Sequence, residues 1–428
     1  MPWFFCRKPE ISLAELDRLV LQAAEECRQR ICPRPRRILI LPPDITRAHS
    51  QAGRIANKLY HFFSAEAEVF LMPTLGQHQP HSAEQNTFMF GDIPASHILV
   101  HDWLNGTKIL GSLQADFVKK VTGGAADWPI PIELNRILFE ANWDLIINIG
   151  QVVPHELLGF ANHNKNYFIG LAGKASLAAS HLAAACYGIE NNLGSFLPPL
   201  RQCFNKAEAD FLSDLPHVYF LLVLKQLADK SLKHCGFYCG TDLKTYLEAA
   251  KHSQEVNVTI TPPLKKVVAL MQGDEFFSTW VANKAIYRTR KALADGGELL
   301  IIAPGLKRFG EQEVVDRIIR TYGYCGTARL LKLWKEKEEL QEYSHATAHL
   351  IHGSTENRFT VTYACRDLSR AEIEGVGYKY MDLDEALAKY PPAELSPGFN
   401  RLPDGEEIYF ISTPALGLWT TREKYQTK

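Results

Sequence analysis

The sequence has little of what marks several large classes of protein. Its nine cysteines are scattered without the paired C-x-x-C spacing of zinc ribbons, so we expect reduced thiols. The 47 basic side chains are balanced by 48 acidic ones, which leaves no global field to attract nucleic acid or anionic lipid. No run reaches the roughly 18 apolar residues of a membrane span, and the N-terminal MPWFFCRKPE lacks the pattern of a signal peptide. We therefore expect a cytoplasmic protein whose partner is a small molecule, not nucleic acid or membrane.

At 428 residues and 46% hydrophobic, the chain is long enough for two or three domains with ample cores. In its first half, apolar runs that read as strands lead into polar loops, as in ILILPPDITR, EVFLMPTLGQH, HILVHDW and DLIINIGQVVPH. The segment GRIANKLYHFF between them has helical periodicity. This alternation predicts an α/β domain with a mostly parallel sheet.

The Pro-Pro turn in TPPLKK indicates a domain boundary, after which the alternation starts again. The expected elements are the strand KVVALM, a helix through FSTWVANKAIYRTRKALADGG, the strand ELLIIAPG and the helix EQEVVDRIIRTYG. A long charged helix near LLKLWKEKEELQEY, the strand RFTVTYAC, the helix DLDEALAKY and the strand EIYFIST follow. We therefore predict an N-terminal α/β domain over residues 1–260 and a smaller C-terminal α/β domain over residues 261–428.

Polar side chains follow several of the expected strands in the first domain. The carboxyl ends of strands in open α/β sheets form the ligand crevice, so we expect these side chains to converge. They are Asp44, Arg47, His78, His101, Asp102 and His155.

Three of these residues suggest chemistry, each beside an ordinary alternative. Asp44 and Arg47, three apart, can orient an imidazole and bind an anion, although a surface ion pair or turn cap would use the same residues. His78 can act as a general base near neutral pH, or it can be a hydrogen-bonded loop histidine. His101 is expected to be structural.

The spacing of three residues in the segment that follows is more informative. Lys165 comes ten residues after His155 and sixteen before His181. Two imidazoles and an amine placed in this way suggest a site that holds a soft metal and a covalently attached cofactor. The Gly, Asn and Lys of GFANHNKNYFIGLAGK suit a close approach to phosphates and a lysine near an electrophile. A glycine-rich connection with solvated side chains remains the alternative.

A second histidine pattern, SHATAHLIH, places His345, His349 and His352 on one helical face. It resembles a zinc helix, but Ala346 stands where a zinc protease needs its glutamate. We therefore expect a polar helix face here.

Several segments together resemble the lactate racemase family, whose members use a nickel-pincer nucleotide. PPDITR resembles the family's Asp-x-Thr-Arg loop, and GQHQPHSAE resembles its Gly-Thr-His-Arg-Pro segment. VPHELLGFANHNKNYFIGLAG is similar to its His, Gly-Phe, Lys, Gly block, with His181 at the distance of the metal-binding histidine. AIYRTRKAL resembles the Tyr-Gln-x-x-Lys-Ala-Leu helix of the second domain. The resemblance spans most of the chain and implies two α/β domains with the active site in the cleft between them.

The resemblance also implies roles for individual residues. Lys165 would hold the cofactor, a pyridinium-3,5-bisthiocarboxylic acid mononucleotide, through a thioamide, and His181 would bind its nickel. His78 and His155 would be the acid/base pair. The remaining cofactor-binding residues would be Asp44, Arg47 and Gly159. The substrate would be bound by Arg47, Tyr287, Arg288 and Lys291.

This chain departs from the lactate enzyme in two places. The block SGGRK of that enzyme is ANHNK here, so Asn164 replaces an arginine, and Arg288 stands where the lactate enzyme has glutamine. A cation in place of a neutral amide argues for a substrate more anionic or more hydroxylated than lactate. Arg201 lies in a segment that resembles a subgroup of homologues. It could approach the site or end a turn, and we expect that it ends a turn.

The resulting hypothesis is a 2-hydroxyacid racemase or epimerase that works by proton-coupled hydride transfer through a 2-keto acid. Its substrate would be a sugar acid or a hydroxy dicarboxylate. Maturation would need the enzymes of cofactor biosynthesis, so protein made in a host without them would lack the cofactor. The alternatives are a hydride-transferring dehydrogenase or lyase on the same scaffold, and a protein that binds the nickel cofactor without racemase activity.

Overall fold

The computed structural model describes residues 2–227 and 231–425. The chain forms two compact units, the first made of residues 2–180, 196–227 and 231–256 and the second of residues 181–195 and 257–425. Among the helices formed by the described residues, none combines the length and apolar character that a bilayer crossing requires.

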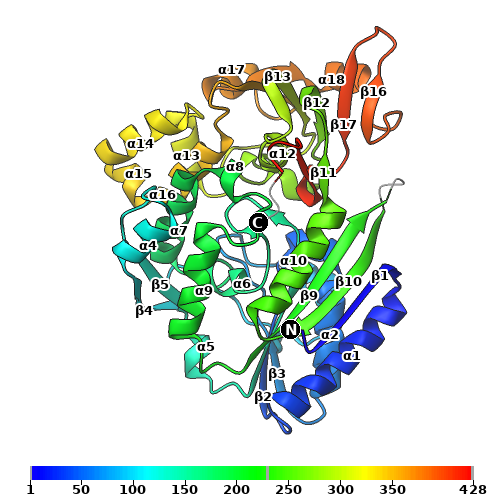
Figure 1. The fold of residues 1–428 in the computed structure, drawn as a ribbon, viewed down its shortest axis with the longest axis vertical. Coiled ribbons are helices and arrows are strands. Elements are labelled where there is room, and N and C mark those ends of the chain that lie inside the picture. The colour runs from blue at the N-terminus through cyan, green and yellow to red at the C-terminus, as the bar shows by residue number, and fades with distance from the viewer. Residues whose placement is uncertain (1, 228–230, 426–428) are drawn as a thin grey trace. The chain divides into compact units, whose positions relative to one another are not determined.

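A six-stranded sheet forms the centre of the first unit, with strand order β1-β10-β9-β6-β2-β3 (Figure 1). The strands β9, β6, β2 and the edge strand β3 are parallel, and β10 and β1 continue the sheet in antiparallel fashion. All residues of β6 are buried, as expected for a strand covered on both faces. The strands are Phe4–Ile11 (β1), Arg37–Leu41 (β2), Glu68–Leu71 (β3), Leu145–Gln151 (β6), His217–Gln226 (β9) and Leu232–Gly240 (β10).

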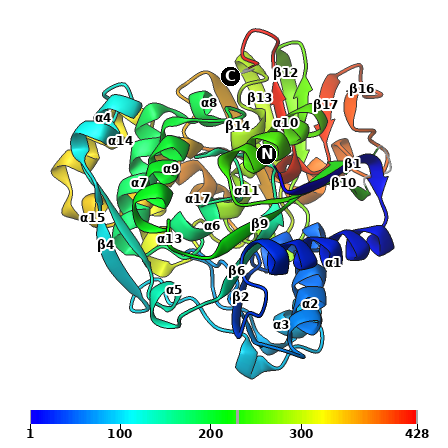
Figure 2. The same cartoon turned by 60° about the horizontal axis from the view of Figure 1, so that its bottom comes forward.

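Two amphipathic helices, α1 (Leu13–Arg30) and α2 (Ala52–Phe63), lie side by side in both views (Figures 1 and 2). Their apolar stripes share one buried cluster with Ile38, Ile40 and Ile147 of the sheet. The other helices of this unit are Ala83–Phe90 (α3), Ala115–Val121 (α4), Ile137–Glu140 (α5), Lys165–Phe168 (α6), Pro199–Phe211 (α9) and Leu243–Asn257 (α10). Two small antiparallel hairpins pair Thr107–Leu113 (β4) with Ile130–Asn135 (β5), and Pro154–His155 (β7) with Gly159–Phe160 (β8).

The second unit has a six-stranded sheet of order β15-β14-β13-β12-β17-β16, parallel except for its last pair. Val268, Leu300 and Phe410 belong to the buried cluster on this sheet. Its strands are Leu264–Leu270 (β12), Leu293–Ile302 (β13), Phe359–Cys365 (β14), Lys379–Asp382 (β15), Gly398–Arg401 (β16) and Glu407–Ile411 (β17). A separate parallel pair joins Val258–Ile260 (β11) and Leu418–Thr420 (β18).

The helices of the second unit are mostly short. They are Ile189–Asn192 (α8), Thr279–Ala282 (α11), Lys284–Thr289 (α12), Glu313–Tyr322 (α13), Thr327–Glu336 (α14), Glu338–Glu342 (α15), Ser344–Gly353 (α16), Arg370–Gly375 (α17) and Leu383–Lys389 (α18). The helix α7 (Lys174–Tyr187) starts in the first unit, and its residues from His181 onward belong to the second.

The prediction of a mixed α/β fold with mostly parallel sheets is confirmed, but three expected elements are wrong. HILVHDW forms no strand, because it makes only a single bridge from Ile98 to Leu71 and leaves Val100 exposed. The helix expected through ALADGG ends at Thr289, since the chain from Leu293 pairs with β12. The long charged helix is interrupted at Lys337, whose backbone is extended.

Candidate functional site

Asp44 and His78 form the first part of the candidate site. After β2 and two prolines, Asp44 caps the short 3-10 helix η1 (Ile45–Ser50), and its Oδ1 accepts hydrogen bonds from Thr46 N at 3.2 Å and Thr46 Oγ1 at 2.6 Å. Its Oδ2 makes a short hydrogen bond with Nδ1 of His78. Burial alone would raise the pKa of Asp44, but the charge and hydrogen bond of His78 outweigh it and hold that pKa well below its usual range. The carboxylate is therefore ionised and fixes a proton on Nδ1 of His78.

His81 contacts the same loop through the backbone of Ile45, and it was not predicted from the sequence as a site residue. Its Nε2 accepts a hydrogen bond from Ile45 N at 2.8 Å, so its proton lies on Nδ1, which donates to Asn86 Oδ1 at 3.1 Å. Burial lowers the pKa of His81, in agreement with this neutral form. The backbone of Gly76, at a φ of 58°, donates to Gly170 O at 2.9 Å and ties the His78 loop to the segment after α6.

Lys165 is the first residue of α6 and is half-buried. Burial, and next the positive charge of Arg47, lower the pKa of its amine to about 8, while Glu156 and Asp44 act in the opposite direction. The amine therefore lies within electrostatic range of all three charged groups. The structure thus brings together Asp44, Arg47, His78 and Lys165, four residues that were predicted from the sequence.

His155 is buried in the hairpin β7–β8, directly opposite Gly159. Gly159 has a φ of 72°, a conformation that favours glycine and allows the tight turn. The Nδ1 of His155 accepts a hydrogen bond from Leu157 N at 3.2 Å, which places the proton of the neutral ring on Nε2, 3.8 Å from Glu156 Oε1. Because Glu156 also acts on Lys165, the carboxylate links His155 to the lysine.

Arg201 was expected to end a turn, and this expectation is wrong. It lies in α9 with no solvent exposure, and its guanidinium donates to Phe160 O at 2.7 Å, to Asn162 O at 3.2 Å and to Asn164 Oδ1. The side chain thus supports the loop that leads into Lys165. A single arginine, separated by 36 positions from that lysine and belonging to no motif, gives no signal of this contact in the sequence.

The predicted nickel ligand, His181, lies half-buried in the middle of α7. In residues 2–227 and 231–425, no group of three or more His, Cys, Asp or Glu side chains is arranged to hold a metal ion. The role of His181 as a nickel ligand stays a prediction.

The three predicted substrate residues of the second unit lie in or next to α12. The hydroxyl of Tyr287 is 3.0 Å from His349 Nδ1, and Arg288 is completely buried. Lys291 donates from Nζ to Leu193 O at 3.2 Å, and burial lowers the pKa of its amine to about 8. Their contact with a substrate stays a prediction.

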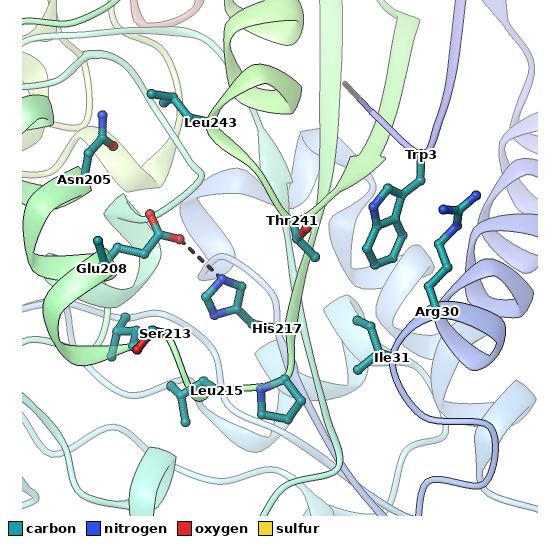
Figure 3. Close-up of a pocket in the computed structure, with 13 residues that line it drawn as sticks. Trp3, Arg30, Ile31, Asn205, Glu208, Ser213, Leu215, His217, Thr241 and Leu243 are labelled. Atoms are coloured by element: carbon teal, nitrogen blue, oxygen red, sulfur yellow. Dashed lines mark ion pairs between the residues drawn. The ribbon is translucent and has the colours of Figure 1, made fainter.

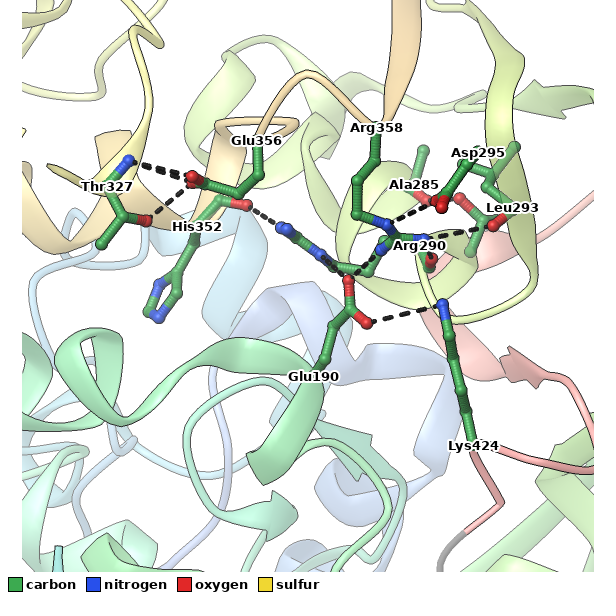
Figure 4. Close-up of polar contacts among 11 residues, drawn as sticks. Glu190, Ala285, Arg290, Leu293, Asp295, Thr327, His352, Glu356, Arg358 and Lys424 are labelled. Carbon is green, nitrogen blue, oxygen red and sulfur yellow. Dashed lines mark hydrogen bonds and ion pairs between the residues drawn. The ribbon is translucent and has the colours of Figure 1, made fainter. Parts of the chain in front are cut away.

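Glu190 of α8 contacts several cationic side chains of the second unit, as Figure 4 shows. Its Oε1 is 3.2 Å from Arg290 Nε and also contacts Arg358, and its Oε2 is 3.8 Å from Lys424 Nζ. Arg290 donates further to His352 O at 2.8 Å. Sequence reasoning missed this cluster, because its members come from four distant segments.

The histidines of α16 do not form a solvated polar face, contrary to expectation. The helix is buried along its whole length, including His345, His349 and His352. The ring of His349 stacks on Trp280 with centroids 4.5 Å apart, and its Nε2 is 2.9 Å from Tyr324 OH. His101 has the expected structural surroundings, since it is buried with its nitrogens on Ala172 O and on the side chain of Asn135.

The fold and these side chains define a two-unit α/β protein with an ionised Asp-His pair, a second buried histidine and a lysine of lowered pKa. Residues 18–192 match the sequence profile of the lactate racemase N-terminal domain. This part of the chain is therefore similar to the N-terminal domain of lactate racemases, and the similarity supports a racemase-type function. No curated protein matches the sequence significantly.

Two solved structures have a similar fold. A Thermotoga maritima protein aligns with a TM-score of 0.81 and 23% identity, covering 95% of this chain and 98% of that one. The lactate racemase apoprotein from Thermoanaerobacterium thermosaccharolyticum aligns with a TM-score of 0.68 and 15% identity, covering 97% and 94%. At these identities the similarity establishes the fold.

Proposed function

We propose that this protein is a 2-hydroxyacid racemase or epimerase that carries a nickel-pincer nucleotide on Lys165. One observation carries the proposal: the Lys165 amine, with its pKa near 8, lies within electrostatic range of Asp44, Arg47 and Glu156. Asp44 holds His78 and Glu156 lies beside His155, so the two carboxylates that act on the lysine electrostatically each have one of the two histidines as a neighbour. A structural lysine would not need two histidines connected to it in this way.

The residues of the chain fit the cofactor by their chemistry. A thioamide forms through a neutral amine, and a pKa near 8 leaves roughly a tenth of the Lys165 amine neutral at pH 7. Arg47 would bind an anionic group of the nucleotide, and His181 is an imidazole ligand of the kind that late first-row metals accept. When bound, the cofactor would supply reversible hydride storage, which no side chain provides.

The two histidines suit opposite proton tasks. In its neutral form His78 has its proton on Nδ1 against Asp44, so its Nε2 would accept the hydroxyl proton of the substrate. His155 has its proton on Nε2 and would donate it to the oxygen of the 2-keto acid. For the opposite stereoisomer the two roles exchange. Inversion of a hydroxy acid needs one such group for each face.

The substrate carboxylate is assigned to Arg47, Tyr287 and Lys291, which offer two cations and a hydroxyl. Arg288 is assigned to a second polar or anionic part of the substrate, because a guanidinium binds oxygen anions with several parallel donors. The proposed substrate is therefore a sugar acid or a hydroxy dicarboxylate.

The experiment that tests the proposal is expression together with the cofactor biosynthesis enzymes. Intact-protein mass should show an adduct in wild type and in Lys174→Ala, a half-buried control lysine at the start of α7, but none in Lys165→Ala. Nickel analysis should show loss of metal in His181→Ala. The loaded protein should then reduce the optical purity of a 2-hydroxy acid in a panel that includes lactate. An adduct retained in Lys165→Ala, or a loaded protein that oxidises the panel without racemising it, would overturn the proposal.

A further inference from the structure

The loop before Lys165 has an unusual backbone. Asn162 and His163 both adopt left-handed conformations, with φ of 67° and 60°, in the positions where the resembling motif has two glycines. Residues with a side chain occupy this region at a cost, and two in succession need support from their surroundings. Asn162 also packs against Gly150 at the end of β6, where an added Cβ would lie 1.9 Å from Asn162 Nδ2. The loop is therefore held in one conformation by contacts outside itself.

Arg201 supplies the main contacts. Its guanidinium reaches the carbonyl oxygens of Phe160 and Asn162 and the amide oxygen of Asn164, so it binds alternate residues along the loop. The opposite side of the guanidinium rests on the ring of Tyr246, 4.3 Å from its centroid. A planar fork of donors is needed for these contacts, and the single ammonium group of a lysine could not reproduce them.

The amide of Asn164 lies between a cation and an anion. Its oxygen accepts from Arg201, while its Nδ2 donates to Glu208 Oε2 at 2.9 Å and to Asn205 Oδ1 at 2.8 Å. This arrangement fixes which end of the amide faces each partner. An aspartate at position 164 would instead place a second carboxylate against Glu208.

Glu208 is itself firmly held. It accepts from the hydroxyl of Tyr219 and lies 3.4 Å from His217 Nε2. Burial would raise the pKa of Glu208, but the nearby His163 and His217 lower it to about 2. The outer side of Glu208 lines a pocket of about 720 Å³, together with His217 and Asn205 (Figure 3).

We propose that Arg201, Asn164 and Glu208 are positioning residues that set the orientation of Lys165 for covalent attachment of its electrophile. The proposal rests on the proposed function of Lys165. Asn164 directly precedes the lysine, and its carbonyl accepts from Tyr167 N at 3.1 Å and Phe168 N at 3.0 Å, so it anchors the first turn of α6. The contacts of Asn164 therefore fix the backbone turn that carries the side chain of Lys165.

Charge and geometry can be separated experimentally. Arg201 contributes to the lowered pKa of Lys165, although less than burial and Arg47 do. Arg201→Lys retains the positive charge and removes the fork. The pKa of Lys165 should therefore stay near 8 in this variant while the orientation of its amine is lost.

The test is competitive labelling of the apoprotein with trace acetic anhydride across pH 6 to 11, with each lysine quantified by mass spectrometry. Exposed Lys119 is the internal reference. In wild type, Lys165 labelling should rise with pH with a midpoint near pH 8 and level off at higher pH, before that of Lys119 does. Arg201→Lys, Asn164→Ala and Glu208→Gln should each change the plateau relative to Lys119, because release of the loop alters the access of the reagent to the Lys165 amine. The control variant is Arg37→Lys at the start of β2, where the guanidinium of Arg37 donates to Ala141 O. It also loses a planar set of donors, and it should leave the Lys165 plateau unchanged.

The outcomes separate the two proposals. If the labelling of wild-type Lys165 neither levels off at a lower pH than that of Lys119 nor exceeds it, the proposed role of Lys165 in cofactor attachment fails. If wild-type Lys165 behaves as expected and the plateau in the three variants is unchanged, the positioning role is overturned and the proposed function stands. Circular dichroism checks folding. If Arg201→Lys is unfolded, Asn164→Ala and Glu208→Gln decide the question, since they remove the contacts between the buried Asn164 and the half-buried Glu208.

Discussion

His78 donates its Nδ1 proton to Asp44, whose other carboxylate oxygen is already occupied by two hydrogen bonds from Thr46. In Asp44→Asn, Thr46 would keep the amide oxygen on its side, so the NH₂ group would face His78 and force its proton onto Nε2. The Nε2 atom of His78 would then carry a proton and could no longer accept one from the substrate. We predict a loss of turnover of roughly 10²- to 10⁴-fold in the loaded enzyme.

The tautomer change is measurable without a substrate. Nitrogen NMR of the ring should report a protonated Nδ1 in wild type and a protonated Nε2 in Asp44→Asn. The control is Asp102→Asn, in an exposed turn where the carboxylate accepts hydrogen bonds from the backbone of Leu104 and Asn105 and from the side chain of Asn105. An Asp44→Asn enzyme as active as Asp102→Asn would contradict the assignment.

Asp44 should also make stability depend on pH. Its folded pKa lies below its unfolded value, so its ionised form favours folding at all pH values above roughly 4, and this contribution is lost as pH falls toward the folded pKa. The difference in unfolding free energy between wild type and Asp44→Asn should therefore be fully present at pH 5 and shrink below pH 4. Urea unfolding at several pH values measures it, and a difference that grows on acidification would contradict the prediction.

The complementary protons of His78 and His155 predict a symmetric requirement. Each stereoisomer would use one ring as base and the other as acid, so His78→Ala and His155→Ala should each slow both directions by roughly 10²- to 10⁴-fold. Exposed His61→Ala is the control. In deuterated water the hydrogen at the stereocentre should remain largely unexchanged, since it moves as hydride. Rapid deuterium incorporation would point to a carbanion mechanism instead.

Arg288 should determine substrate preference. If it binds a second polar or anionic part of the substrate, Arg288→Gln should weaken the native reaction by about 1.5–3 kcal/mol in kcat/KM, the usual value of a hydrogen bond to a charged group. Activity on small monocarboxylates such as lactate should rise at the same time. Unchanged relative rates across the panel of hydroxy acids would remove Arg288 from the substrate site.

The sequence was sufficient for several parallel strands of the two large sheets and for one part of the site. Continuous apolar runs such as those of β2 and β6 identify buried parallel strands, and polar residues at their carboxyl ends, such as Asp44, lie together because the topology brings those ends to one edge. HILVHDW has the same apolar pattern but no strand partners, which periodicity cannot reveal. Arg201 and His349 were misjudged for a related reason: their partners lie far away in the sequence, so no local pattern reports that a charged or polar side chain is buried.

The last prediction concerns the proton order around His349. Thr279 Oγ1 donates to Phe309 O at 2.8 Å, so the hydroxyl of Tyr324, 2.9 Å away, must donate to Thr279. The Nε2 of His349 must then donate to Tyr324.

In a neutral His349, the remaining ring nitrogen, Nδ1, accepts from Tyr287, whose hydroxyl orientation is thereby fixed. His349→Phe keeps the stacking on Trp280 but leaves two buried hydroxyls without the ring. We expect the unfolding free energy to fall by about 1–3 kcal/mol for each hydroxyl that loses its partner. Tyr287→Phe should then lower the unfolding free energy much less in the His349→Phe background than in wild type. Additive effects in this double-mutant cycle would show that His349 does not orient Tyr287.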